Sequence, residues 1–145
     1  MSEAPDPVGD RTLRTGPGRL LVAVYAVFAL AATARGSYQL ATRFDEAPLA
    51  YGLSVLAGVI YLVAAVGLAR AGRTSRLVAL VSVSVEMIGV LVVGALSVLA
   101  AGAFPDDTVW SHFGSGYLFI PLVLPVLGLW WILQVHRMDL DAART

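Results

Sequence analysis

The sequence of 145 residues contains no cysteine and no lysine, and only 14% of its residues are charged. Without cysteine, the chain can form no disulfide, no thiolate metal site and no thiol redox centre. Soluble domains carry about a quarter charged residues, so the low charge content argues against a soluble fold. The hydrophobic fraction reaches 58%, more than a soluble chain of this length could bury. The composition therefore predicts a membrane protein.

Four apolar stretches are long enough to cross the hydrocarbon core as helices, which takes about 20 residues. They cover residues 20–42, 49–69, 77–101 and 113–135. Because the connections between them are short, successive helices should run antiparallel. The predicted fold class is all-α, an up-down bundle of four transmembrane helices. Outside the bundle, we expect a disordered N-terminal tail (1–19) and a C-terminal tail (136–145).

The ten basic residues, all arginines, are distributed unevenly between the two predicted sides of the membrane. Two, Arg35 and Arg43, lie on one side. The other eight lie in the N-terminal tail, the second connection and the C-terminal tail: Arg11, Arg14, Arg19, Arg70, Arg73, Arg76, Arg137 and Arg144. Since arginine-rich loops stay in the cytoplasm, both termini are predicted to be cytoplasmic and the membrane to be the plasma membrane.

A signal peptide is an alternative interpretation of the first stretch. The N-terminal arginines, the apolar run after Leu20 and the small residues "ATA" at 32–34 resemble a secretory signal with its cleavage site. The apolar pattern continues beyond that site through Leu40, which favours an uncleaved first helix. Cleavage would leave three spans.

One carboxylate, Glu86, lies near the middle of the third stretch, "LVALVSVSVEMIGVLVVGALSVLAAG". Inserting an acidic residue at a helix centre costs about 2.5–3.5 kcal/mol. The surrounding valine, leucine and isoleucine residues each contribute about −0.3 to −0.6 kcal/mol, so insertion is still favourable. Because burial disfavours the charged form, we expect Glu86 to be mostly protonated at neutral pH.

Small residues surround Glu86 on its predicted helix face and match a stripe on the second span. On the third span, Ser82 and Gly89 share the face of Glu86; on the second, Ser54, Gly58 and Tyr61 form a stripe. Small residues let helices approach closely in a membrane, so we predict that these two faces pack together. Tyr61 and Glu86 lie at similar depths, and the phenol is expected to donate a hydrogen bond to the carboxyl.

These residues define a candidate binding site at the bilayer midplane. It would comprise Glu86, Tyr61, Arg35, Pro121 and Pro125. The two prolines free backbone carbonyls and predict a broken fourth helix. Arg35 is long enough to lean towards Glu86 or to extend outward to the membrane surface. In the alternative interpretation, Glu86 is a neutral, hydrogen-bonded residue that holds the helices in register.

No recognised catalytic arrangement accompanies this site. The sequence contains no nucleophile–base pair, phosphate loop or nucleic-acid signature, so we expect no catalytic residues, no cofactor and no nucleic-acid partner. Asp106, Asp107 and His112 follow no metal-binding spacing, and we expect no metal site. Enzymatic activity therefore has little support.

Two segments, "RGSYQLATRFDEAPLAYGLSVLAGVIYLVA" (35–64) and "FIPLVLPVLGLWW" (119–131), carry a family resemblance. The chain resembles a group of small actinobacterial integral membrane proteins without an assigned activity. The resemblance implies a four-helix plasma-membrane protein and no particular substrate.

Two functions remain open. The first is a non-enzymatic accessory or assembly subunit, which would bind copies of itself or a larger membrane complex through helix contacts. The second is a small transporter or proton-linked carrier that uses Glu86. The discriminating feature is whether Glu86 faces a wet cavity or a dry seam between helices.

Overall fold

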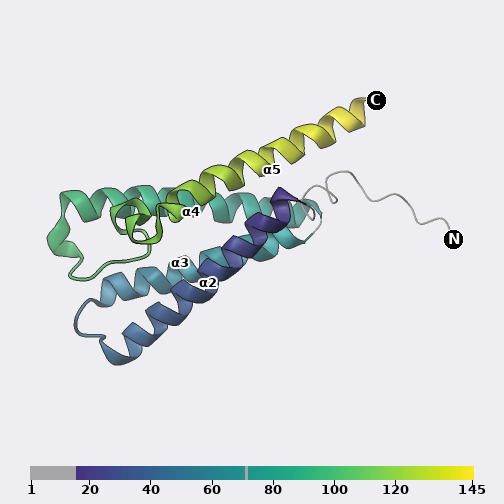
Figure 1. Ribbon diagram of the computed structural model, residues 1–145. Helices are drawn as coiled ribbons and strands as arrows, with labels where there is room; N and C mark the ends of the chain where they lie inside the picture. The colour runs from purple at the N-terminus through teal and green to yellow at the C-terminus, as the bar shows by residue number, and fades with distance from the viewer. Residues whose placement is uncertain (1–15, 71) are drawn as a thin grey trace.

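The computed structural model describes residues 16–70 and 72–145, and in this part of the chain every regular element is a helix. Figure 1 shows the four long helices: α2 (Pro17–Thr42), α3 (Pro48–Ala69), α4 (Arg73–Leu99) and α5 (Ile120–Arg144). Two short 3₁₀ helices, η1 (Ala101–Ala103) and η2 (Ser111–Tyr117), lie between α4 and α5. Each long helix is long and apolar enough to cross a membrane, which supports a multi-pass membrane protein.

The long helices extend beyond several of the predicted boundaries. The expected N-terminal tail lies outside the described residues up to residue 15, but Pro17 begins α2, where its fixed φ suits the first turn of a helix. At the other end, α5 continues to Arg144, so the predicted C-terminal tail is helical. The structure therefore places helix where the hydropathy pattern predicted tails.

The fourth helix begins later than predicted, at Ile120 instead of residue 113. Four non-glycine residues before it have positive φ angles, between 52° and 60°: His112, Phe113, Leu118 and Phe119. This left-handed conformation cannot continue a right-handed helix, so α5 starts only after it. Pro121 occupies the first turn, where it removes no helical hydrogen bond, and α5 runs unbroken through Pro125. The predicted break in the fourth helix is wrong.

Close helix approaches occur at glycines, but Gly58 and Gly89 do not face the neighbours that were predicted for them. A Cβ atom added to Gly58 would lie 2.8 Å from the backbone nitrogen of Thr33, so Gly58 faces α2 rather than α4. Helix α3 approaches α4 closely at Gly67, where an added Cβ would lie 2.8 Å from the Ala79 nitrogen. Helix α3 packs most extensively on α2. Gly58, in the small-residue stripe of α3, therefore permits the close approach of α2.

The segment after α4 folds back onto that helix. A Cβ on Gly89 would lie 2.7 Å from the indole of Trp110, and one on Gly94 would clash with the Phe113 ring. The prediction that Gly89 faces α3 is thus wrong, because the indole occupies that space. Trp110 is only 2% exposed, so the protein encloses its indole. The glycines of α4 accommodate this segment.

Candidate functional site

Glu86 lies on the inward face of α4 and is completely buried. Val83 and Val90, one turn before and after it, are also fully buried, and Ser82 on the same face is nearly so. Ser82 donates its hydroxyl hydrogen to the Val78 carbonyl of its own helix at 2.7 Å and not to the Glu86 carboxyl. Glu86 must therefore find its partners on other helices.

The partner of Glu86 is Tyr25 of α2. The Tyr25 hydroxyl donates a hydrogen bond of 2.7 Å to Oε2 of Glu86, and the Tyr25 side chain is fully buried. Among the described helices, α2 packs closely on α3 and touches α5 at few points, so the long phenol reaches α4 by its side chain alone. The prediction that Tyr61 donates to Glu86 is wrong, because Tyr25 occupies that position.

A glycine in α5 leaves room for this hydrogen bond. A Cβ atom added to Gly128 would lie 3.2 Å from the Tyr25 hydroxyl and 3.3 Å from Cγ1 of Val83. Both distances are shorter than ordinary van der Waals contact between such groups. Residues of α2, α4 and α5 therefore meet at the Glu86 carboxyl, and the absence of a side chain at Gly128 permits their approach.

Tyr61 of α3 also lies in this region, with a different partner. Its hydroxyl accepts a hydrogen bond of 2.7 Å from the Trp110 indole N–H, and both side chains are buried. The Trp110 backbone is held by the Thr108 hydroxyl at 3.0 Å, which also lies 3.2 Å from the Ser111 hydroxyl. A buried indole N–H needs an acceptor, and Tyr61 supplies it. Tyr61 thereby anchors the segment that follows α4.

A row of aromatic rings connects the two tyrosines with the far end of α2. The Tyr25 and Tyr61 ring centroids are 6.1 Å apart, Phe28 packs edge-on against Tyr61 at 6.1 Å, and Tyr117 follows at 6.0 Å from Phe28. Such distances suit favourable aromatic pairs. Arg35 is exposed and donates to the Tyr117 hydroxyl at 2.6 Å. Arg35 therefore ends this row and is not the ionic partner of Glu86.

The remaining predicted residues lie in the core without a shown contact to the carboxyl. Pro121 and Pro125 are fully buried within α5. Ser54 is buried too, and donates to the Ala50 carbonyl of its own helix at 3.1 Å. Of the five residues in the predicted midplane site, the structure thus gives Glu86 none of the other four as a hydrogen-bond partner.

Tyr25 is the residue that sequence reasoning missed. A usable signal existed, because Tyr25 is the polar residue in the otherwise apolar stretch "LLVAVYAVFAL" of the first span. The stripe of small residues on the second span indicated that span, and not the first, as the neighbour of Glu86. A side chain as long as tyrosine, however, does not require its helix to pack directly against the acceptor's helix.

The arrangement provides one buried carboxyl with one phenol donor. Oε1 of Glu86 has no hydrogen-bond partner within residues 16–70 and 72–145. No cluster of three potential metal ligands occurs in that part of the chain. In the connection between α4 and α5, Asp106 accepts from Tyr51 at 3.0 Å, and Asp107 lies 3.8 Å from His112. Glu86 and Tyr25 can share a proton within their hydrogen bond.

Comparison with known proteins adds no family or function: no family model, no curated protein and no solved structure matches the chain.

Proposed function

We propose that the protein is a non-enzymatic accessory or assembly subunit of the plasma membrane, which binds copies of itself or a larger membrane complex through its helix surfaces. The four apolar helices support placement in a membrane. Their outward faces carry exposed leucine and valine side chains, such as Leu30, Leu62 and Val92. In a bilayer such faces contact either lipid or other helices.

We further propose an up-down bundle with both termini in the cytoplasm. Eight of ten arginines support this orientation. An ion pair between Arg76 at the start of α4 and Asp139 near the end of α5 supports only the part of this topology in which these two helix ends lie on the same side of the membrane. Reporter enzymes fused after Gly72 and after Thr145 should give cytoplasmic signals, and one at Asp107 an external signal. An external signal after Gly72 would overturn this topology.

The observation that carries the structural role of Glu86 is its complete burial beside Tyr25. Its oxygen receives a hydrogen bond from another helix, and Gly128 of a third helix closes on the same point. A carrier site would need access for its ion or substrate. The Glu86 side chain is fully buried, so no such access reaches it in this structure. These features favour a dry seam that holds three helices together.

A small proton-linked carrier is the second candidate, and one observation favours it. Oε1 of Glu86 lacks a partner among the described residues, so the carboxyl retains a free site for a proton or a ligand. Intramembrane acids often serve such functions. The two candidates differ in their requirement for a titratable group at this position.

Substitution of Glu86 by glutamine separates the two candidates. An amide preserves the shape and the hydrogen-bond acceptor but cannot take up and release a proton at physiological pH. For a subunit, Glu86→Gln protein should fold, reach normal abundance and complement a deletion strain. Normal folding without complementation would contradict the accessory role and support the carrier.

The partner itself can be sought with tagged protein purified gently in detergent or nanodiscs. Co-purifying chains are then identified by mass spectrometry. A stoichiometric membrane partner, or a defined homo-oligomer, is the expected result, and it should persist in Glu86→Gln. A strictly monomeric protein without partners would count against the accessory function.

A further inference from the structure

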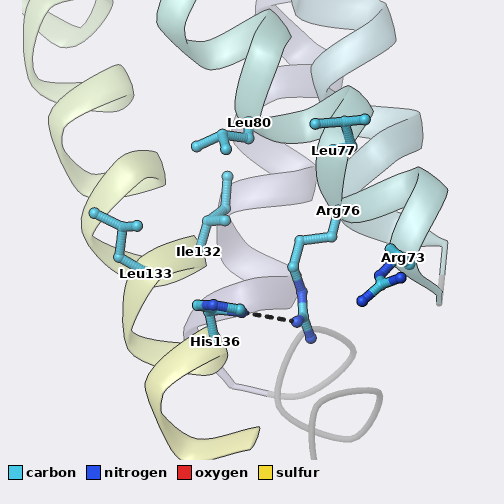
Figure 2. A pocket seen from close by; sticks show the side chains of 7 residues that line it. All are labelled: Arg73, Arg76, Leu77, Leu80, Ile132, Leu133 and His136. Carbon is cyan, nitrogen blue, oxygen red and sulfur yellow. Dashed lines mark hydrogen bonds between the residues drawn. The ribbon is translucent and has the colours of Figure 1, made fainter. Parts of the chain in front are cut away.

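A cavity of about 340 Å³ lies between the beginning of α4 and the second half of α5. Figure 2 shows its two contrasting ends: Arg73, Arg76 and His136 lie together at one end, and Leu77 and Leu80 lie towards the other. Ile132 and Leu133 of α5 complete its wall. The cavity therefore joins a cationic end, at the boundary of the apolar helices, to an apolar groove that follows those helices.

The cationic end has unused capacity to bind an anion. Arg76 donates to Asp139, and one of its terminal nitrogens lies 3.4 Å from Nδ1 of His136. Its Nε is buried and has no partner among the described residues. Arg73 makes no hydrogen bond to the other lining residues (Figure 2). Of the two guanidinium groups in the lining, only that of Arg76 is paired with a carboxylate among the described residues, which leaves an excess positive charge.

The start of α4 adds to this preference for negative charge. Its first turn contains no acidic residue, and Gly72 before it provides no side-chain cap. The first backbone N–H groups of a helix lack acceptors within the helix, and its N-terminus carries a partial positive charge. A phosphate near Arg73 would meet these groups as well as the two arginines.

We infer that this cavity binds an anionic phospholipid of the surrounding leaflet. The phosphate would lie between Arg73 and Arg76, and the beginning of an acyl chain would follow Leu77, Leu80 and Ile132. Basic pockets between membrane helices at the bilayer surface suit such headgroups. Free phosphate would use only the cationic end, because a hydrated ion gains nothing from contact with leucine side chains. This inference requires the helices to lie in a membrane and is independent of the choice between subunit and carrier.

The test measures lipid binding to the full chain in detergent by native mass spectrometry, with phosphatidylglycerol and phosphatidylcholine of identical acyl chains. Phosphatidylglycerol should bind more tightly. Arg73→Gln and Arg76→Gln should each weaken its binding about five-fold, since an arginine near a membrane surface contributes on that order to the attraction of anionic lipid. Asp139→Asn should strengthen binding, because it removes the competing carboxylate.

The matched control is Arg137→Gln, which removes the same charge from α5, one residue after His136, but outside the cavity lining. It should leave the preference for phosphatidylglycerol unchanged. An equal loss in all three arginine variants would overturn the site in favour of general surface attraction. Inorganic phosphate that competes as well as the lipid would overturn the lipid assignment.

Arg73→Gln keeps the test decisive if Arg76→Gln disturbs folding, because Arg73 makes no hydrogen bond to the other lining residues. Size-exclusion profiles and circular dichroism confirm the fold of each variant before lipid binding is compared. Unchanged lipid selectivity in folded Arg73→Gln protein would contradict the proposal.

Discussion

Glu86 and Arg76 lie on the same helix, yet the protein treats their charges in opposite ways. Glu86 is in the middle of α4, completely buried, with a phenol from another helix as its donor. Arg76 is near the start of α4, and its side chain remains 26% exposed while it pairs with Asp139. Residues of α2, α4 and α5 enclose Glu86, whereas Arg76 lines a cavity.

The difference shows how depth decides the role of a polar group in such a bundle. At the centre of an apolar helix, a carboxyl without protein partners would face hydrocarbon, so neighbouring helices must supply them. Near the end of the helix, water and lipid headgroups can satisfy a guanidinium. We therefore expect substitutions at the enclosed region to affect stability strongly, and those at the boundary to affect binding more than stability.

The largest losses of stability should come from replacing a glycine by leucine where another segment packs closely against it. Gly58→Leu forces α3 away from the Thr33 backbone, and Gly89→Leu expels the Trp110 indole. Overpacking of this kind costs about 1–3 kcal/mol, or more where backbone must move. Val92→Leu, at a position 50% exposed on the outer face of α4, is the control. Equal unfolding temperatures of all three proteins in detergent would contradict this packing.

The next largest effect concerns the hydrogen bond itself. Glu86→Leu leaves the Tyr25 hydroxyl without an acceptor, and Tyr25→Phe leaves the carboxyl without its donor. Each should lower the free energy of unfolding by about 1–2 kcal/mol. Glu86→Gln should have a much smaller effect. Tyr38→Phe, at an exposed tyrosine of the same helix, is the matched control for Tyr25→Phe.

A double-mutant cycle then tests whether the two residues act together. Because one interaction cannot be lost twice, Tyr25→Phe combined with Glu86→Leu should cost less than the sum of the single substitutions. The measurement is equilibrium unfolding in detergent. Strict additivity would show that the carboxyl and the phenol do not share a hydrogen bond.

A smaller effect is expected from Gly128→Ala. The added methyl group would press on the Tyr25 hydroxyl at 3.2 Å, so a shift of a few tenths of an ångström must be accommodated. We expect a destabilisation of about 1 kcal/mol. At Gly52 an added Cβ meets nothing within 4 Å, so Gly52→Ala should be neutral or slightly stabilising. The reverse order of the two thermal midpoints would refute the proposed role of Gly128.

The smallest effect should follow removal of the boundary ion pair. The side chains of Arg76 and Asp139 are 26% and 28% exposed, and partly exposed pairs contribute about 1 kcal/mol or less. Arg76→Gln should therefore change the unfolding temperature little, and the change should shrink at high salt. A loss as large as that of Glu86→Leu would show that the boundary is as enclosed as the seam.

Single-helix properties could be predicted here, whereas the partners of individual side chains could not. The inward direction of Glu86 was predictable because Ser82 and Ser97 share its helix face, and all three are buried. The predicted neighbours of Gly58 and Gly89 were wrong. A stripe of small residues predicts that some other segment packs closely, but it does not indicate which segment. Thr33 meets one and the Trp110 indole meets the other.

The connection before α5 shows the same limit. Hydropathy extended the fourth span back to Phe113, since "FGSGYLFIPLVLP" is largely apolar. In the structure, residues with a left-handed backbone conformation turn this segment so that it packs against α4. Gly94 of α4 leaves room for the Phe113 ring. Hydropathy measures the preference for a non-aqueous environment, and both lipid and the protein interior satisfy it.

The sequence by itself determined the helical class, the number of apolar spans and the face on which Glu86 lies. These properties follow from composition and from the 3.6-residue period, which act within one segment of the chain. Only the tertiary structure decided that Tyr25 is the donor, that Tyr61 serves Trp110 and that Arg35 ends at Tyr117. Such pairings depend on which helices are neighbours and on how far each side chain reaches. In a membrane that choice follows from the packing of close surfaces, and no local pattern encodes it.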